Sequence, residues 1–153
     1  VETTDGTQVT GTTTATISRS YQIPGGRIGQ DCIIDVRWGI TALSNNTIQP
    51  RLYINTTNSL VGATQIAAGV NLTAINTTSN TWRLIMVDKA SEKFRIPQNG
   101  TSTISNWLST ATATSPSEYV VDLDNDIWLL FANHQPAGGS SVVYFASVQI
   151  IEV

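Results

Sequence analysis

The chain ends on the stretch Val142-Val143-Tyr144-Phe145-Ala146-Ser147-Val148-Gln149-Ile150-Ile151-Glu152-Val153. This stretch is rich in β-branched and aromatic residues and contains neither proline nor glycine, which is typical of a long and mostly buried β-strand. An end this apolar must be paired in a sheet or covered by a partner subunit. The stretch therefore predicts that the last strand closes the fold, and it favours an assembly of several chains.

The same kind of pattern recurs upstream. Residues 31–42 alternate, with Ile34, Val36, Trp38 and Ile40 on one face and Asp35 and Arg37 on the other, which predicts a strand with one buried face. Further strands are predicted over 51–55, 63–67, 82–88, 94–96, 119–121 and 127–131. The run 82–88 is expected to be buried on both faces near its middle, and residues 133–141 are expected to form a loop.

These eight to ten strands, with no helix longer than two turns, predict an all-β fold. The expected architecture is a single antiparallel β-sandwich domain, jelly-roll-like, over residues 17–153. Residues 1–16 are rich in threonine and glycine and are expected to be a lead-in, either a linker or an edge strand. Because the chain begins at Val1 rather than methionine, we expect it to be a fragment or a processed product.

The composition narrows the class of protein. The chain has 153 residues, a natural size for one domain, and 12% of them are charged, against about 25% in typical proteins. A surface of neutral polar residues suits an extracellular or virion-surface protein. The net charge is −3 and the basic residues are scattered, so we expect neither nucleic-acid binding nor attraction to anionic membranes. No apolar stretch is long enough for membrane insertion.

Several stretches carry a family resemblance: Ile23-Pro24 before a hydrophobic strand, Arg51-Leu52-Tyr53-Ile54-Asn55-Thr56, Gly62-Ala63-Thr64-Gln65-Ile66-Ala67, and the alternating chain end. Over about residues 20–153 the chain resembles the C-terminal domains of tailed-bacteriophage tail fibres and tailspikes. The resemblance implies a homotrimer of jelly-roll-like domains at the distal end of a fibre, which folds and caps the trimer and sometimes binds a surface glycan or protein. It carries over no catalytic residue.

The single cysteine and the single histidine offer little chemistry. Cys32 begins the apolar run Cys32–Ile34, which predicts a buried, inert thiol. A catalytic pairing of Cys32 with His134 is the less favoured alternative. Ser140 and Ser141 follow two glycines but form no Gly-x-Ser-x-Gly elbow, so a hydrolytic triad is not expected.

Three acidic residues alternate at Asp122, Asp124 and Asp126. An EF-hand calcium loop counted from Asp122 would need glycine at its sixth position and glutamate at its twelfth. Those positions hold Ile127 and Asn133. We therefore expect a charged turn, no bound metal and no cofactor, with calcium as the minority alternative.

A glycosidase would need two carboxylates flanking a sugar-binding cleft. Glu118 with Asp122, or Asp88 with Glu92, could supply such a pair. Eleven acidic residues will bring some pair close together in any fold, so the pattern is weak and we expect the chain not to be an enzyme.

The candidate receptor-binding residues are Trp107, Asn133 and His134. Trp107 has the most polar setting of the four tryptophans, whereas Trp38, Trp82 and Trp128 lie in apolar strands and are expected in the core or a trimer interface. Asn133 and His134 fall in the expected loop, and loops at the end of a rigid sandwich often carry binding.

The sequence therefore predicts a non-enzymatic domain at the distal end of a phage tail fibre or tailspike, exposed on the virion tail. We expect it to trimerise and to contribute to recognition of a host-surface glycan. A monomeric carbohydrate-binding module with a row of exposed aromatic residues is the first alternative. A jelly-roll capsid or decoration protein and a glycan hydrolase are the others.

Overall fold

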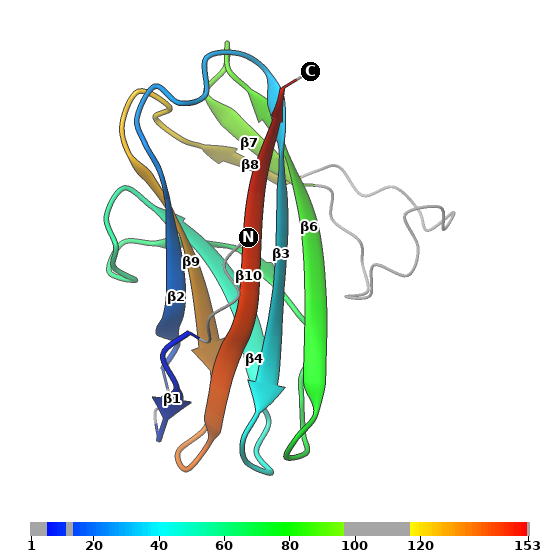
Figure 1. Cartoon of the computed structure of the whole chain (residues 1–153). Helices are drawn as coiled ribbons and strands as arrows, with labels where there is room; N and C mark the ends of the chain where they lie inside the picture. The colour runs from blue at the N-terminus through cyan, green and yellow to red at the C-terminus, as the bar shows by residue number, and fades with distance from the viewer. Residues whose placement is uncertain (1–5, 12–13, 97–116, 153) are drawn as a thin grey trace.

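The computed structural model describes residues 6–11, 14–96 and 117–152. In this part of the chain the fold is all-β, as the sequence predicts, and it consists of ten strands (Figure 1). They are β1 Val9–Thr10, β2 Thr16–Ile23, β3 Cys32–Ala42, β4 Gln49–Asn55, β5 Thr64–Ala68, β6 Thr78–Asp88, β7 Lys93–Ile96, β8 Ser117–Val120, β9 Ile127–His134 and β10 Ser140–Glu152. The described residues include no helix that could cross a membrane.

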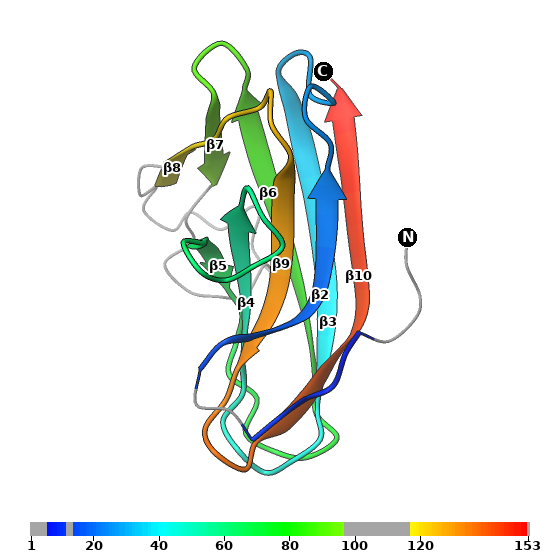
Figure 2. The same ribbon diagram turned by 90° about the vertical axis from the view of Figure 1, so that its left-hand side faces the viewer.

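The strands form two antiparallel sheets that pack face to face (Figures 1 and 2). One sheet has six strands in the order β1-β10-β3-β6-β7-β8, and the other has four in the order β2-β9-β4-β5. Neighbours in each sheet are mostly far apart in the sequence, so the chain crosses repeatedly between the sheets. The predicted antiparallel β-sandwich is confirmed.

The core fills the space between the sheets. The predicted apolar face of β3 is confirmed, because Ile34, Val36, Trp38 and Ile40 are all buried. The indole of Trp38 packs against the Phe131 ring of the opposite sheet, with the ring centroids 5.7 Å apart. Large apolar side chains at such contacts supply most of the free energy that holds two sheets together.

Strand β10 confirms the prediction from the chain end and is the longest strand described. It pairs with β3 from Ser141 to Glu152, and a bulge interrupts the register between Val143 and Phe145. On its other side β10 pairs with β1 only at Ser140 and Ser141. From Val142 to the end of β10, the outer edge of this strand has no neighbouring strand among the described residues.

The described part of the threonine-rich lead-in is bound to both sheets. The backbone N–H of Gly6 donates to the carbonyl oxygen of Val143 at 2.7 Å, and that of Thr7 donates to Ser18 at 2.8 Å. Val9 is buried and pairs with Ser141. Of the two predicted alternatives, linker or edge strand, these residues therefore form a short edge strand.

Two local predictions are wrong. Strand β6 is not buried on both faces, because Met86 is 40% exposed on the outer face. Asn133 and His134 do not lie in a loop, because β9 extends to His134. The apolar run 127–131 continues through Ala132 along the sheet, so the pairing with β4 persists for three more residues.

Candidate functional site

The structure separates the predicted binding residues from one another. Consecutive residues of a strand point to opposite faces, so Asn133 and His134 cannot both face a ligand. Asn133 is fully buried between the sheets and donates from Nδ2 to the hydroxyl of Ser141 at 2.9 Å. It is therefore structural, which corrects the prediction, whereas His134 lies on the outer face and is partly exposed. Trp107 lies outside the described residues.

His134 belongs to the outer face of the four-stranded sheet. The register pairs Gln49 with His134, Arg51 with Ala132, Tyr53 with Leu130 and Asn55 with Trp128. The alternate residues of both strands, Leu52, Ile54, Leu129 and Phe131, belong to the core. We call the outward set the β4–β9 face: Gln49, Arg51, Tyr53, Trp128, Leu130, Ala132 and His134.

The centre of this face is apolar and closed to solvent. Leu130 and Ala132 are almost completely buried although they point outward. Tyr53 and Trp128 beside them are partly exposed. An exposed aromatic ring beside hydrogen-bonding groups offers both an apolar surface and polar anchors. Such a surface can hold a sugar, whose C–H groups stack on the ring and whose hydroxyls bond to the anchors.

Arg51 is held in place by its own strand. Its Nε donates to Oε1 of Gln49 at 2.9 Å, and its Nη1 lies 3.5 Å from the hydroxyl of Tyr53. Residues two apart on a strand share a face, so the spacing Gln-x-Arg-x-Tyr builds this row without any partner from another strand. The guanidinium is therefore oriented before any ligand arrives.

His134 is electrostatically linked to Arg51. Partial burial lowers the pKa of His134 below its ordinary value, and the positive charge of Arg51 lowers it further. Both effects disfavour the charged imidazolium. At neutral pH the ring is therefore uncharged and can both donate and accept a hydrogen bond.

We expect the Arg51→Gln variant to raise the pKa of His134. Removing the cation relieves its repulsion of the imidazolium, while the larger effect of burial remains, so the new pKa should stay below the ordinary value of a histidine. The chain contains a single histidine, so one NMR titration of the imidazole protons gives the value directly. Arg37→Gln, on the other sheet, is the control and should leave the pKa unchanged. An equal shift in both variants would contradict the placement of His134 beside Arg51.

A hollow lies beside the end of β4 and the start of β9. It is open, has a volume of about 310 Å³, and is lined in part by Asn55, Thr64, Val120 and Asp122. Nδ2 of Asn55 donates to the carbonyl oxygens of Ser59 and Val61 at 2.7 and 3.0 Å. Asn55 thereby fixes the loop between β4 and β5 that forms one wall of the hollow.

The outer face of the six-stranded sheet carries a different cluster. The buried carboxylate of Asp35 accepts hydrogen bonds from Nη2 of Arg37 and Nε1 of Trp82, both at 2.7 Å. The guanidinium carbon of Arg37 lies 5.0 Å from the centre of the Trp82 ring. Nearby, Tyr144 lies over Gly39. In this cluster the charge of Arg37 is already matched by Asp35.

Trp82 and Trp128 do not lie in the core, so of the two expected places, core or trimer interface, the core is wrong for them and the interface stays a prediction. Each is partly exposed on an outer sheet face, and only Trp38 of these three tryptophans is buried. Within their strands, Trp82 is in phase with Leu84 and Met86, and Trp128 is in phase with Leu130. Because all of these side chains are apolar, the alternation did not indicate which face was outward.

The acidic turn does not form the regular array that its spacing suggests. Carboxylate oxygens of Glu92, Asp122 and Asp124 lie within 4.8 Å of one another. The ammonium of Lys89 lies 3.0 Å from Asp124 and 3.9 Å from Glu92, so a protein cation already offsets part of this charge. Asp126 is directed elsewhere and accepts a hydrogen bond from the backbone N–H of Gly25 at 2.9 Å.

The carboxylates considered for glycosidase chemistry are engaged in other contacts. Glu118 accepts hydrogen bonds from Lys93 and Arg95, which lower its pKa. Hydrogen bonds from Ser91 lower the pKa of Asp88, and one from Asn125 lowers that of Asp122. A general acid for glycoside cleavage needs the opposite shift. These three side chains are therefore unsuited to that role.

The cysteine and the histidine do not meet. Cys32 lies at the end of the sandwich where β3 begins and β10 finishes, whereas His134 lies toward the other end, where β9 finishes (Figure 1). Cys32 is buried, as predicted, and burial raises the pKa of its thiol. A raised pKa suppresses the reactive thiolate.

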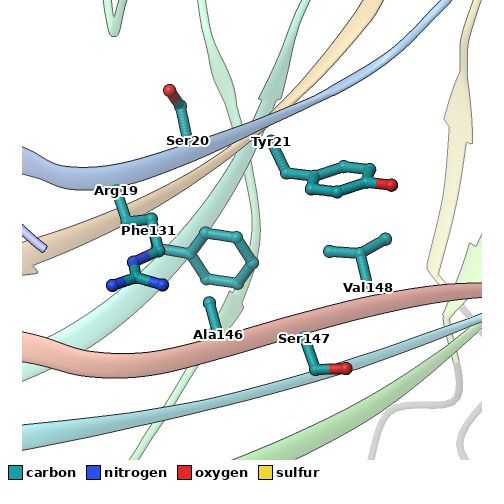
Figure 3. A pocket seen from close by; sticks show the side chains of 7 residues that line it. All are labelled: Arg19, Ser20, Tyr21, Phe131, Ala146, Ser147 and Val148. Carbon is teal, nitrogen blue, oxygen red and sulfur yellow. The ribbon is translucent and has the colours of Figure 1, made fainter. Parts of the chain in front are cut away.

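A small cavity lies between β2 and β10, where the two sheets meet at one side of the sandwich (Figure 3). Its volume is about 70 Å³, and Figure 3 shows Tyr21, Phe131 and Val148 around it. The cavity is too small for a sugar ring, so it marks a seam between the sheets rather than a ligand site.

No family model, curated protein or solved structure matches this chain. The candidate site is therefore identified from its geometry alone. Within the described residues, the β4–β9 face combines partly exposed aromatic rings, an oriented guanidinium and an uncharged imidazole.

Proposed function

We propose that this chain is a non-enzymatic domain from the distal end of a phage tail fibre or tailspike, exposed on the virion tail, and that it recognises a host-surface glycan. The observation that carries the proposal is the β4–β9 face, where Tyr53, Trp128, Arg51 and His134 point outward from two paired strands. Sites built on paired strands are rigid, so little conformational entropy is lost on binding.

The contacts of the acidic residues support a binding role rather than catalysis. The carboxylates of Asp88, Glu118 and Asp122 each have a lowered pKa and are bonded to neighbouring donors. Recognition of a neutral sugar surface by stacking and hydrogen bonding needs no titrating group, so the β4–β9 face is chemically sufficient for the proposed role.

The strand orders support a jelly-roll arrangement. A jelly roll has eight strands in two sheets, and the orders β1-β10-β3-β6 and β2-β9-β4-β5 account for eight of the ten strands here. Strands β7 and β8 then form a hairpin-like extension at one edge. This arrangement fits the fibre-tip resemblance of the sequence.

The free edges support the proposed homotrimer. Strand β2 ends the four-stranded sheet. Beyond Val143, whose backbone groups bond to Gly6 and Ser18, the outer side of β10 has no neighbouring strand among the described residues. Unprotected strand edges with apolar side chains tend to associate, and Ile151 near the end of β10 is 40% exposed. A neighbouring subunit would cover this edge, and light scattering should then give three times the mass of 16.5 kDa.

We expect Trp128→Ala and Tyr53→Ala each to weaken glycan binding at least about fivefold, since aromatic anchors in binding surfaces commonly contribute about 1 kcal/mol or more. The measurement is surface plasmon resonance of the purified domain against a panel of bacterial surface polysaccharides. The matched control is Trp82→Ala, which removes a partly exposed tryptophan from the opposite sheet and should leave the affinity unchanged.

The outcome of this experiment separates the alternatives. Loss of binding in Trp82→Ala with normal binding in Trp128→Ala would contradict the assignment of the face. A domain that binds glycan but has the mass of one chain would favour the monomeric carbohydrate-binding module instead. A trimer that binds none of the panel would favour a structural capsid or decoration role.

A further inference from the structure

Arg51 is a surface cation without a carboxylate partner among the described residues. Among the described residues, Arg27, Arg37, Lys89, Lys93 and Arg95 form ion pairs with carboxylates, and Arg19 has an interaction of its own. Arg83 differs because it is largely buried and donates to the carbonyl oxygens of Trp82 and Ala68. The guanidinium of Arg51 is therefore oriented on an outer face, and no described carboxylate neutralises its charge, although the chain as a whole has a net charge of −3.

The contacts of Arg51 leave some N–H groups of its guanidinium available to a ligand. Gln49 accepts from Nε, and the Tyr53 hydroxyl lies beside Nη1. Both partners are neutral, so neither cancels the charge, and no hydrogen bond of Nη2 to another described residue is seen. A guanidinium with free N–H groups is suited to a carboxylate or a phosphate, which it can bind through two parallel hydrogen bonds.

The surroundings allow an anionic group to approach. Directly across the sheet from Arg51 lies Ala132, whose small side chain is almost fully buried. His134 lies two register pairs further along β9, opposite Gln49. No described residue of the β4–β9 face is acidic. An anion bound to Arg51 would therefore meet no acidic side chain of this face.

We propose that the β4–β9 face binds an acidic glycan, with a carboxylate or phosphate of the glycan on Arg51 and a sugar ring against Tyr53 or Trp128. The inference rests on the proposed function and narrows its ligand to anionic sugars. Hydrogen bonds to charged groups are stronger than those between neutral groups, so the anion would fix the register of the glycan on this face.

The test compares matched ligands and matched variants. The probes are a uronic-acid polysaccharide before and after reduction of its carboxyl groups to alcohols, and a phosphate-bearing surface polysaccharide before and after removal of its phosphates. Affinities for the native domain, Arg51→Gln, Arg51→Lys and the opposite-face control Arg37→Gln are measured by surface plasmon resonance. Thermal unfolding of each variant checks that the fold is intact.

We expect the native domain to bind one of the two acidic probes at least about tenfold more tightly than its neutralised form, the free-energy equivalent of about 1.4 kcal/mol. Arg51→Gln should lose that preference, Arg51→Lys should keep part of it, and Arg37→Gln should keep all of it. The probe that responds distinguishes a carboxylate from a phosphate.

The failures of the two proposals look different. Equal binding of the acidic and neutralised forms, lost in Trp128→Ala, would overturn the acidic ligand and leave glycan recognition by this face intact. A preference for the acidic form that persists in Arg51→Gln would overturn the role of Arg51. Absence of binding to all four probes would overturn the acidic ligand, and the neutral polysaccharides of the wider panel would then decide the proposed function.

Discussion

Replacing Trp38 with alanine should destabilise the domain by about 3 to 5 kcal/mol, the usual cost of removing a large buried aromatic side chain. Trp38 is 1% exposed and contacts Phe131 across the two sheets, so its loss leaves a cavity at the contact that joins them. For a domain of this size the melting temperature should fall by roughly 10 °C. Urea unfolding at a fixed protein concentration measures the effect.

Trp38→Phe is the informative companion variant. The indole Nε1 of Trp38 is buried and has no hydrogen-bond partner among the described residues, and an unpaired buried donor costs about 1 to 3 kcal/mol. Phenylalanine keeps a ring against Phe131 and removes this donor, so it should cost much less than alanine. A loss for Trp38→Ala no larger than that for the partly exposed Trp128→Ala would contradict the core position of Trp38.

The second large effect is expected for Gln135→Ala, which should cost about 2 to 3 kcal/mol. Gln135 is fully buried, and its Nε2 donates to the carbonyl oxygens of Val9 and Gly139, each at 3.0 Å. Its Oε1 accepts from the Ser141 hydroxyl at 2.8 Å. Alanine would leave several buried polar groups unpaired at once, and unfolding in urea would report the loss.

Gln8→Ala is the matched control for Gln135→Ala. Gln8 is exposed, and its amide makes one hydrogen bond to the Ser140 hydroxyl at 2.8 Å, so its replacement should be nearly neutral. Gln135→Ala should also release β1, and hydrogen exchange at Val9 and Thr10 should become faster. Similar small losses in both variants would show that the buried network contributes little.

The fold could be predicted because its signal is local. Alternation within 31–42 and within the chain end places apolar residues on one side of a strand, and burial of that side follows from the hydrophobic effect alone. The strand orders could not be predicted in the same way. They depend on pairings such as β10 with β3 and β9 with β4, which join residues about a hundred or about eighty positions apart.

The candidate site could not be predicted from the sequence because it depends on these strand pairings. The spacing of Gln49, Arg51 and Tyr53 was visible in the sequence, but His134 and Trp128 join this row only through the register of β9 against β4. Asn133 was misplaced because its polar side chain suggested a loop. In the structure it is buried and bonded to Ser141, which is how a polar group can occupy a strand interior.

The tryptophan indole N–H resonances test the central claim most directly. Trp128 lies on the β4–β9 face, Trp82 on the opposite sheet and Trp38 in the core, so one NMR titration with the bound polysaccharide reports on three places at once. If the β4–β9 face recognises the glycan, the Trp128 indole and the His134 imidazole resonances shift while those of Trp38 and Trp82 stay in place. Shifts of Trp82 with Trp128 and His134 unmoved would contradict the claim.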